Sequence, residues 1–427
     1  MTYLEAMEYI HGVYWRGSKL GLQRITELLS LMGDPQDGLE FVHVAGTNGK
    51  GSVCAMLASV LGEQGYRTGL YTSPYIEVFN ERIQVNGRPI SDENLSAVTE
   101  YVRGFAESMA DLPTEFEIVC AIAFEYFKRE RCDIVVLEVG LGGLLDATNV
   151  IKKPLVSVIT AIDFDHMEHL GATISEIAAQ KCGIIKSQTA VVSYEQTPEA
   201  RSVIEAKCTE TQSPLLFCDF GTLKSVKDSL DGQRFSYRDF DDLGLKMLGS
   251  YQQKNAALVV DVLTALNGKG FEISDKALRS GLEKAVWPAR FEVLCSDPLF
   301  VLDGAHNVHG ACAVVAAARR YFGEKKAVVL IGVLRDKEYD KMLEVVDDIA
   351  SAYIAASPDS PRAVPARELA EFLGRFDKPI EVADNISDAV GMACKRAKAA
   401  AAPGLALGSL YMAGEIRKYF RDTENTN

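Results

Sequence analysis

The sequence lacks the features that mark an exported or zinc-binding protein. Its nine cysteines are scattered over 427 residues, with no Cys-x-x-Cys pair. Cys54, Cys120 and Cys312 lie within apolar segments of the sequence. This distribution predicts reduced, buried thiols and argues against disulfides or a zinc site.

Long hydrophobic runs and basic clusters are absent as well. No apolar stretch reaches the roughly 18 residues that indicate a membrane span, and the mixed, acidic start Met1–Glu8 is unlike a secretory signal. We therefore expect a cytoplasmic protein without a membrane partner. The net charge of −14 and the lack of a Lys/Arg-rich block disfavour nucleic-acid binding. Anionic small molecules stay open as substrates, because local cations and Mg²⁺ decide their binding.

The chain does contain an alternation of strand-like apolar runs and helical patterns, which predicts a doubly wound α/β fold. Residues 213–242 are more polar and alternate, as in an antiparallel sheet. A helical run ends near Pro288 and a new strand–helix series follows, so we expect two domains, residues 1–287 and 288–427. The expected parallel strands are 41–45, 133–139, 155–160, 190–193, 300–303, 327–331 and 353–356, and the expected helices include 116–128, 252–266 and 311–322.

The most informative segment is residues 43–52, His-Val-Ala-Gly-Thr-Asn-Gly-Lys-Gly-Ser. It joins an apolar run to a helical one, and a helix N-terminus after a Gly-rich turn binds phosphate through its free N–H groups and its dipole. Lys50 would add a cation for the outer phosphates. The match to the common phosphate loop is imperfect, since Val44 takes the first Gly position and Gly51 separates Lys50 from Ser52. The alternative is a turn that binds nothing, but we interpret the segment as an ATP site.

Acidic residues stand at the ends of two other apolar runs. Glu138 precedes Gly-Leu-Gly-Gly, and Asp303 precedes Gly-Ala-His-Asn. Carboxylates at the tips of parallel strands lie where open α/β sheets bind ligands, and near a phosphate loop they suit Mg²⁺. Turn or cap roles are the alternative for both residues. The acids and histidines of residues 163–169 match no zinc signature and are also typical of a polar loop. Lys181 on its own indicates an exposed lysine near a helix C-terminus.

Together these segments resemble folylpolyglutamate synthase/dihydrofolate synthase, a member of the Mur ligase superfamily. The resemblance covers nearly the whole chain, and residues 138–143 followed by 145–149 are its most specific part. The matching segments are 43–52, 72–74, 81–83, 114–117, 138–150, 165–171, 181–186, 249–252 with Asn255, 287–292, 303–307, 334–337 and 408–411.

The resemblance implies a fold, cofactors and residue roles. The fold is a P-loop nucleotide-binding N-terminal domain with a small antiparallel β patch, followed by a C-terminal Rossmann-like glutamate ligase domain. The cofactors are ATP and Mg²⁺; a monovalent cation, a carbamylated Lys181 and a monomeric state are further expectations. The implied ATP-binding residues are Thr47, Asn48, Gly49, Lys50, Gly51, Ser52, Asn255, Arg290 and Asp303. The implied Mg²⁺ ligands are Ser73, Glu138 and His166, the pterin-site residues are Thr114, Phe116, Glu117, Leu145, Asp146 and Ala147, and the catalytic residues are Lys50, Lys181 and His306.

The implied activity is ATP-dependent ligation of L-glutamate to tetrahydrofolate, to dihydropteroate, or to both. The substrate carboxylate would attack the γ-phosphate, and the amine of glutamate would then attack the acyl phosphate. The alternatives are a Mur-type ligase acting on a UDP-muramyl precursor and a catalytically silent ATP-binding protein. Two departures from the family pattern stand out, Leu144 in place of Arg and Ala289 in place of Gly. We expect Ala289 to stiffen the hinge between the domains.

Overall fold

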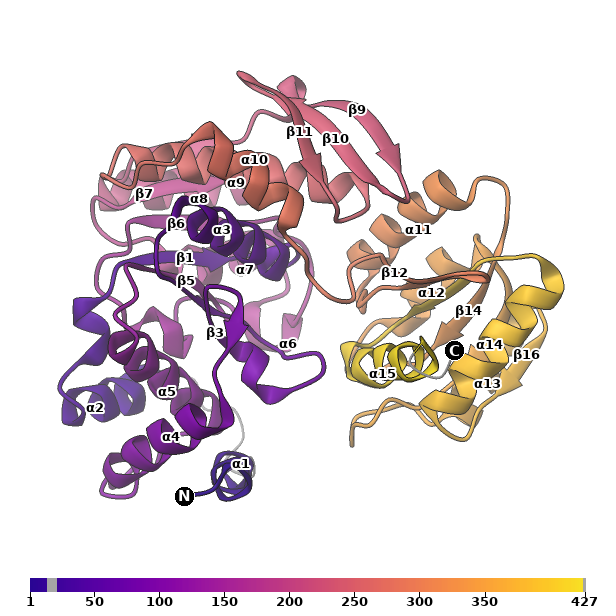
Figure 1. Ribbon diagram of the computed structural model, residues 1–427, viewed down its shortest axis with the longest axis horizontal. Helices are drawn as coiled ribbons and strands as arrows, with labels where there is room; N and C mark the ends of the chain where they lie inside the picture. The colour runs from indigo at the N-terminus through magenta and orange to yellow at the C-terminus, as the bar shows by residue number, and fades with distance from the viewer. Residues whose placement is uncertain (14–20, 425–427) are drawn as a thin grey trace.

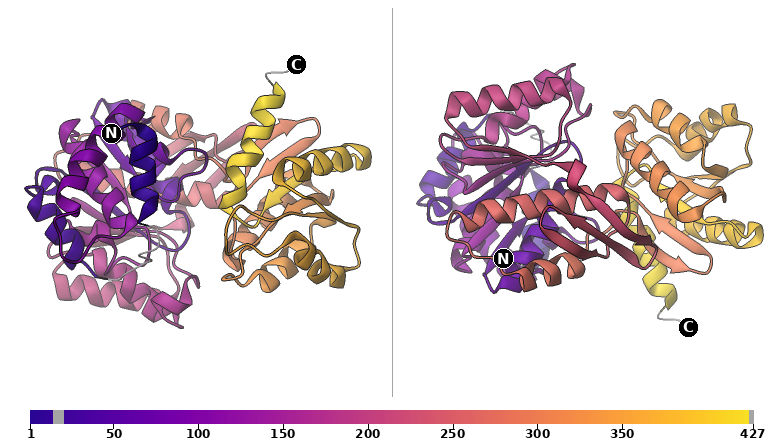
Figure 2. Two further views of the ribbon diagram at one scale, coloured as in Figure 1. Left: turned by 90° about the horizontal axis from the view of Figure 1, so that it is seen from below. Right: turned by 90° about the horizontal axis from the view of Figure 1, so that it is seen from above.

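The computed structural model describes residues 1–13 and 21–424 as two lobes that lie side by side (Figure 1). The first lobe is built on an eight-stranded sheet with the order β4-β3-β2-β5-β1-β6-β7-β8. The second lobe is built on a six-stranded sheet with the order β12-β13-β17-β14-β15-β16. The two further views in Figure 2 show the same separation into two bodies. The predicted α/β fold is confirmed.

In the first lobe, β1 lies between β5 and β6, and all three strands are parallel. The loops after these strands therefore open at one edge of the sheet, which is where open α/β sheets bind ligands. The antiparallel strands β3 and β4 form one edge of the sheet and are too short to show a pattern in the sequence. The strands are β1 Phe41–Ala45, β2 Thr68–Tyr71, β3 Ile83–Val85, β4 Arg88–Pro89, β5 Ile134–Glu138, β6 Val156–Ile159, β7 Ala190–Ser193 and β8 Leu215–Phe217.

Helices cover both faces of this sheet, which is why its central strands are buried along their whole length. Val42 and Val44 pack on the face covered by α3, α9 and α10, whereas Phe41 packs on the opposite face, against α2, α4 and α5. This alternation is the period of two of a β-strand. The helices are α1 Tyr3–Gly12, α2 Gln23–Leu31, α3 Lys50–Gln64, α4 Asp92–Ala106, α5 Glu115–Arg129, α6 Met167–Leu170, α7 Ile174–Lys181, α8 Pro198–Thr211, α9 Ser250–Asn267 and α10 Asp275–Lys284.

The predicted antiparallel patch is a three-stranded sheet at the top of Figure 1. It consists of β9 Lys224–Ser229, β10 Gly232–Tyr237 and β11 Phe240–Leu245. The predicted start of the patch at residue 213 is wrong. Residues 215–217 form β8, which pairs in parallel with β7 and extends the main sheet.

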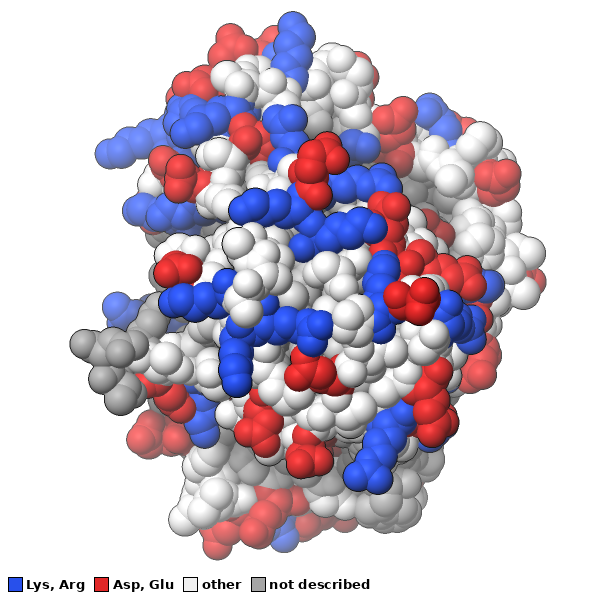
Figure 3. All heavy atoms as spheres, turned by 90° about the vertical axis from the view of Figure 1, so that its right-hand side faces the viewer, with Lys and Arg blue, Asp and Glu red and all other residues white. Residues whose placement is uncertain are grey.

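The second lobe repeats the α/β pattern at a smaller size. Helices α11 to α13 pack on one face of its sheet, and α14 and α15 pack on the other. On the face shown in Figure 3, Lys and Arg side chains are interspersed with Asp and Glu. The strands are β12 Glu292–Ser296, β13 Leu299–Leu302, β14 Ala327–Ile331, β15 Ala350–Ala355, β16 Ile380–Val382 and β17 Gly404–Leu407. The helices are α11 Val308–Phe322, α12 Tyr339–Asp347, α13 Ala366–Leu373, α14 Ile386–Ala400 and α15 Ala413–Glu424.

All nine cysteines are free thiols, as the sequence predicted, but not all are buried. Cys54 and Cys120 are buried, whereas Cys312 is exposed on α11. The residues of α11 that face the core include Ala311, Val314 and Ala318, and the helical period places Cys312 outside that face. Among the described helices, none is long and apolar enough to cross a membrane.

Candidate active site

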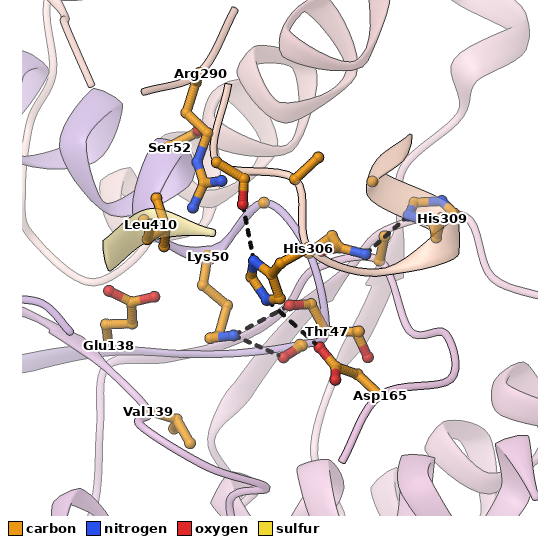
Figure 4. A pocket seen from close by; sticks show the side chains of 18 of the residues that line it. Thr47, Lys50, Ser52, Glu138, Val139, Asp165, Arg290, His306, His309 and Leu410 are labelled. Carbon is orange, nitrogen blue, oxygen red and sulfur yellow. Dashed lines mark hydrogen bonds and ion pairs between the residues drawn. The ribbon is translucent and has the colours of Figure 1, made fainter. Parts of the chain in front are cut away.

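A cavity of about 210 Å³ lies between the two lobes, at the edge where β1, β5 and β6 end (Figure 4). The first lobe supplies residues 46–52, 73–74, 138–142 and 165–166 to its walls. The second lobe supplies Arg290, residues 303–306 and Leu410. The Gly-rich segment and the acidic strand tips therefore meet at one place, although they come from distant parts of the chain.

The Gly-rich segment forms a loop that leads into α3. Gly49 has a φ of 91° and caps the helix, and a side chain there would put its Cβ 2.7 Å from Oδ1 of Asn255. Only glycine meets both conditions. The N–H groups of Thr47 and Asn48 donate to the carbonyl of Ala161, and that of Val53 donates to Gly49. The N–H groups of residues 49–52, at the helix start, are therefore available for an anion. Nζ of Lys50 donates to the carbonyls of Gly46 and Thr47 at 3.1 and 3.2 Å.

Polar side chains of this segment fix it to its surroundings. The hydroxyl of Thr47 donates to the carbonyl of Asp163 at 2.9 Å, and the Ser52 hydroxyl accepts from Gln252 at 3.2 Å. Asn48 contacts the second lobe, where its Nδ2 lies 2.8 Å from Nδ1 of His309. The segment is therefore held by both lobes.

Glu138 is a buried carboxylate that forms no ion pair with the residues the structure describes. It is 4% exposed, and it accepts a hydrogen bond from the backbone N–H of Ser73 at 3.2 Å. Burial raises the pKa of Glu138 to about 7, against the opposing effects of Lys50, the Ser73 N–H and Arg290. Such a carboxylate favours the arrival of a cation.

The donors around Glu138 fit Mg²⁺. No group of three or more His, Cys, Asp or Glu side chains in the described residues is arranged to hold a metal ion. Mg²⁺ instead takes one or two carboxylates together with hydroxyl, water and phosphate oxygens. The Glu138 carboxylate and the Ser73 hydroxyl are such donors, and both residues line the cavity beside the phosphate loop. His166 also lines it, but its imidazole is a softer ligand.

Lys181 lies inside the protein, so its expected exposure near a helix end is wrong. Its side chain is buried, and Nζ donates to the carbonyl of Gly46 at 2.8 Å. Burial, together with the nearby charge of Lys50, lowers the pKa of Lys181 to about 7. At neutral pH much of this amine is therefore uncharged and nucleophilic.

Asp165 joins the lobes on one side of the cavity. Its carboxylate accepts from Nζ of Lys337 at 2.7 Å and from Nδ2 of Asn307 at 3.0 Å, both in the second lobe. The imidazoles of His166 and His306 lie 3.8 and 3.9 Å from it, and burial lowers the pKa of each to about 4. Burial also opposes the ionisation of Asp165, yet its pKa lies below its usual range. Because both imidazoles are neutral at pH 7, Lys337 is the cation that stabilises this carboxylate.

Asp303 connects the cavity to the segment between the lobes. Its Oδ2 accepts from the N–H of Phe291 and its Oδ1 from the N–H of Ala305, each at 2.7 Å. Burial raises the pKa of Asp303, against the opposing charge of Arg290. Ala289 is fully buried with a φ of 55°, in the left-handed region that favours the glycine of the family pattern.

The six residues implied as a pterin site lie outside this cavity. Thr114 and Glu117 form a capping box at the start of α5, and Glu117 accepts from Nε of Arg24 at 3.1 Å. The ring of Phe116 lies against Gly140. The Asp146 carboxylate accepts from the N–H groups of Leu141 and Thr148. Ala147 is buried beside it, whereas Leu144 and Leu145 are 44% and 39% exposed.

Sequence reasoning gave no role to several residues that complete the site. Lys337 and Asn307 lie in segments noted for the family resemblance, but only the structure shows them at Asp165. Trp287 lies against the phosphate loop, because a Cβ on Gly51 would be 2.7 Å from its Nε1. The Thr-x-x-Glu spacing of residues 114–117 was a visible signal for the capping box.

Two family models match the chain. The Mur ligase middle domain matches residues 44–263, and the Mur ligase glutamate ligase domain matches residues 289–405. Together with the site, these domains define a ligase of the Mur type.

Comparison with similar proteins identifies the family within the Mur-type ligases. Dihydrofolate synthase/folylpolyglutamate synthase of Bacillus subtilis is 41% identical over 379 residues, covering 86% of this chain and 88% of the relative. Folylpolyglutamate synthase of Lacticaseibacillus casei is 39% identical over 379 residues, with the same coverage. A solved structure of Mycobacterium tuberculosis folylpolyglutamate synthase, complexed with ADP and AMPPCP, matches with a TM-score of 0.90 at 30% identity, covering 98% of this chain and 99% of that one. The chain belongs to the folylpolyglutamate synthase/dihydrofolate synthase family, which confirms the resemblance seen in the sequence.

Proposed function

We propose that this protein is an ATP-dependent ligase that joins L-glutamate to a folate through an acyl phosphate. The observation that carries the proposal is the meeting of the phosphate loop, the buried Glu138 and the second-lobe residues Arg290, Asp303 and His306 around one cavity. A carboxylate does not form an amide with an amine unaided in water, and transfer of the γ-phosphoryl group gives it a good leaving group. The site therefore has to stabilise a transferred phosphoryl group and exclude water.

Different residues bind the phosphates, bind the rest of the nucleotide and assist the attack of the amine. The N–H groups of residues 49–52 hold phosphate oxygens, and Lys50 neutralises charge on the transferred group. Thr47, Asn48, Asn255, Arg290 and Asp303 complete the nucleotide site. His306, neutral at pH 7, lies on the second-lobe side, where it can orient the phosphate or accept a proton from the attacking amine.

The metal site of this proposal is Mg²⁺ held by Glu138, Ser73 and His166. Bound there, Mg²⁺ would neutralise developing charge on the phosphate oxygens. Its binding requires the ionised form of Glu138, whose pKa of about 7 makes metal affinity fall as the pH drops below neutrality. A monovalent cation near the nucleotide stays a prediction.

Lys181 is proposed to carry a carbamate. Carbamylation joins the nitrogen of a neutral amine to the carbon of CO₂ and releases a proton, which turns the neutral amine into an anionic oxygen ligand. A pKa of about 7 supplies the neutral amine at physiological pH. Lys181→Ala should lose turnover and regain part of it with an added short carboxylic acid, and ¹³C NMR with labelled bicarbonate should detect the carbamate in the wild type only. Without rescue or signal, Lys181 is not carbamylated.

The proposed pterin site lies beside the cavity. Its residues are Thr114, Phe116, Glu117, Leu145, Asp146 and Ala147. Phe116 and Leu145 supply apolar surface, whereas the hydrogen bonds of Glu117 and Asp146 hold the backbone around them. A domain boundary near residue 288 is the proposed organisation, supported by the separate sheets of the two lobes. The monomeric state stays a prediction.

A product assay tests the function and separates its variants. Phosphate release and ligated product are measured with ATP, Mg²⁺ and L-glutamate, using dihydropteroate and tetrahydrofolate in parallel. We expect release to require both the pterin substrate and glutamate. Product from a UDP-muramyl compound alone would overturn the folate assignment, and tight ATP binding without turnover would indicate a silent nucleotide-binding protein.

A further inference from the structure

The loop formed by residues 73–82 belongs to the first lobe, yet it is seated on the second. It leaves β2, and Ser73 at its start donates to Glu138 in the cavity. Its backbone is organised around Glu81, whose carboxylate accepts from the N–H groups of Ile76, Glu77 and Val78 at 2.9 to 3.3 Å. These bonds hold residues 76–81 together, and only Pro74 and Tyr75 separate this group from Ser73.

The outer end of the loop is held by α15. Oε1 of Glu77 accepts from Nε of Arg417, and its Oε2 accepts from Nη1 of Arg421, each at 2.6 Å. The Glu77 and Arg417 side chains are only 17% and 24% exposed, so solvent screens this pair less than a surface ion pair. Burial would raise the pKa of Glu77, but the two arginines lower it below its usual range.

Two further close contacts hold the same loop against the second lobe. Ile76 packs against the hydrophobic core between α14, α15 and their sheet, which otherwise consists of second-lobe residues. Gly414, in the first turn of α15, lies so close to the loop that a Cβ there would be 2.5 Å from the carbonyl oxygen of Ile76. Figure 1 shows α15 on the side of the second lobe that faces the first.

The contact continues to the segment between the lobes. Arg417 also pairs with Glu292, and the other oxygen of Glu292 accepts from the N–H of Ala289 at 2.9 Å. A chain of bonded groups thus runs from Ala289 through Glu292, Arg417 and Glu77 to the loop that begins at Ser73. The Asp165–Lys337 pair joins the lobes at a separate point of the cavity wall.

We propose that Ile76, Glu77, Gly414, Arg417 and Arg421 form an interdomain clamp that seats the Ser73 loop against Glu138 when the lobes close. These residues act as positioning residues for the ligation, and this reading rests on the proposed function. The clamp makes the phosphate-side geometry depend on closure. ATP can then enter an open protein, and phosphoryl transfer begins only when the second lobe has docked.

The test is a double-mutant cycle between Glu77→Gln and Arg417→Met. Each single variant should lower kcat about 5- to 150-fold, the range of typical coupling between two sites, and the double variant should be little worse than either single. Nucleotide affinity should change much less than kcat, because the phosphate loop is intact. Arg417→Lys, which keeps the charge, should recover part of the loss.

Glu381→Gln is the matched control, because Glu381 pairs with Arg396 within the second lobe and does not touch the loop. It should leave kcat unchanged. Gly414→Ala supplies a second variant that retains every charge, and we expect it to lower kcat in the same direction.

Small-angle X-ray scattering with AMPPCP and Mg²⁺ supplies a readout that does not depend on turnover. The wild type should become more compact on ligand addition, and the Glu77 and Gly414 variants should not. Unchanged compaction in these variants, or additive effects in the cycle, would overturn the clamp. A wild type that compacts but forms no folate product would refute the proposed function and leave the clamp intact.

Discussion

Replacing Gly51 by alanine isolates the contact between the phosphate loop and the segment that joins the lobes. Gly51 lies in the first turn of α3, where a Cβ would come within 2.7 to 2.9 Å of three atoms of the Trp287 indole. A rigid ring packed against the core cannot move away as a flexible side chain can. We expect the overlap to cost about 1–3 kcal/mol, the usual cost of overpacking. Helix propensity opposes it, since Gly→Ala in a helix gains about 0.5–1 kcal/mol.

Gly62 in the same helix provides the control that separates the two effects. A Cβ at Gly62 meets nothing within 4 Å, so Gly62→Ala should show only the gain in helix propensity. The difference between the two variants is then the overlap with Trp287. Denaturant unfolding gives the stabilities, and calorimetry with AMPPCP and Mg²⁺ should show weaker binding by Gly51→Ala alone. Trp287→Leu added to Gly51→Ala should restore part of both losses. Equal stability and nucleotide affinity of the Gly51 and Gly62 variants would refute this reasoning.

Three further substitutions test the cavity itself. Lys50→Met should abolish turnover and leave the circular dichroism spectrum unchanged, and retained turnover would contradict the phosphate site. Glu138→Gln should abolish Mg²⁺-dependent turnover. It should also raise the free energy of unfolding at pH 8 by up to about 3 kcal/mol, because the folded-state pKa of Glu138, about 7, exceeds its unfolded value. This gain should vanish below pH 4.5, and equal gains at both pH values would show that the ionised carboxylate does not destabilise the fold. Lys337→Met should cost about 3–5 kcal/mol by leaving Asp165 unpaired, and adding Asp165→Asn should recover stability without activity, as denaturant unfolding and the product assay can show.

The sequence predicted those parts of the site that are formed by residues adjacent in the chain. The Gly-rich segment and Glu138 were recognisable because a strand, a turn and a helix N-terminus follow one another along the chain. The same local reasoning was wrong for Lys181, because its burial comes from the loop at Gly46, which lies 135 residues away. It was also wrong for Cys312, whose apolar neighbours in the sequence lie on a different face of α11.

The sequence could not predict the ion pairs that join the two lobes, which we call the seam. Asp165 and Lys337 are 172 positions apart, and Glu77 and Arg417 are 340 apart. Neither pair has a spacing rule, since each depends on how two separately folded bodies dock. Charged residues in loops and on the outer faces of helices are usually solvated, and only the docked structure shows that these four side chains are 10–24% exposed.

We expect contacts between the lobes to couple protonation to closure. In the docked structure Nζ of Lys337 lies 2.7 Å from the Asp165 carboxylate, and the His166 imidazole together with this ammonium lowers the pKa of that carboxyl. By linkage, protonation of Asp165 must favour the open form, because the open form binds that proton more tightly. Acidification into the usual range of an aspartic acid should therefore open the cavity before it unfolds either lobe. A scattering profile that stays compact with AMPPCP and Mg²⁺ in Asp165→Asn would show that this pair does not control closure.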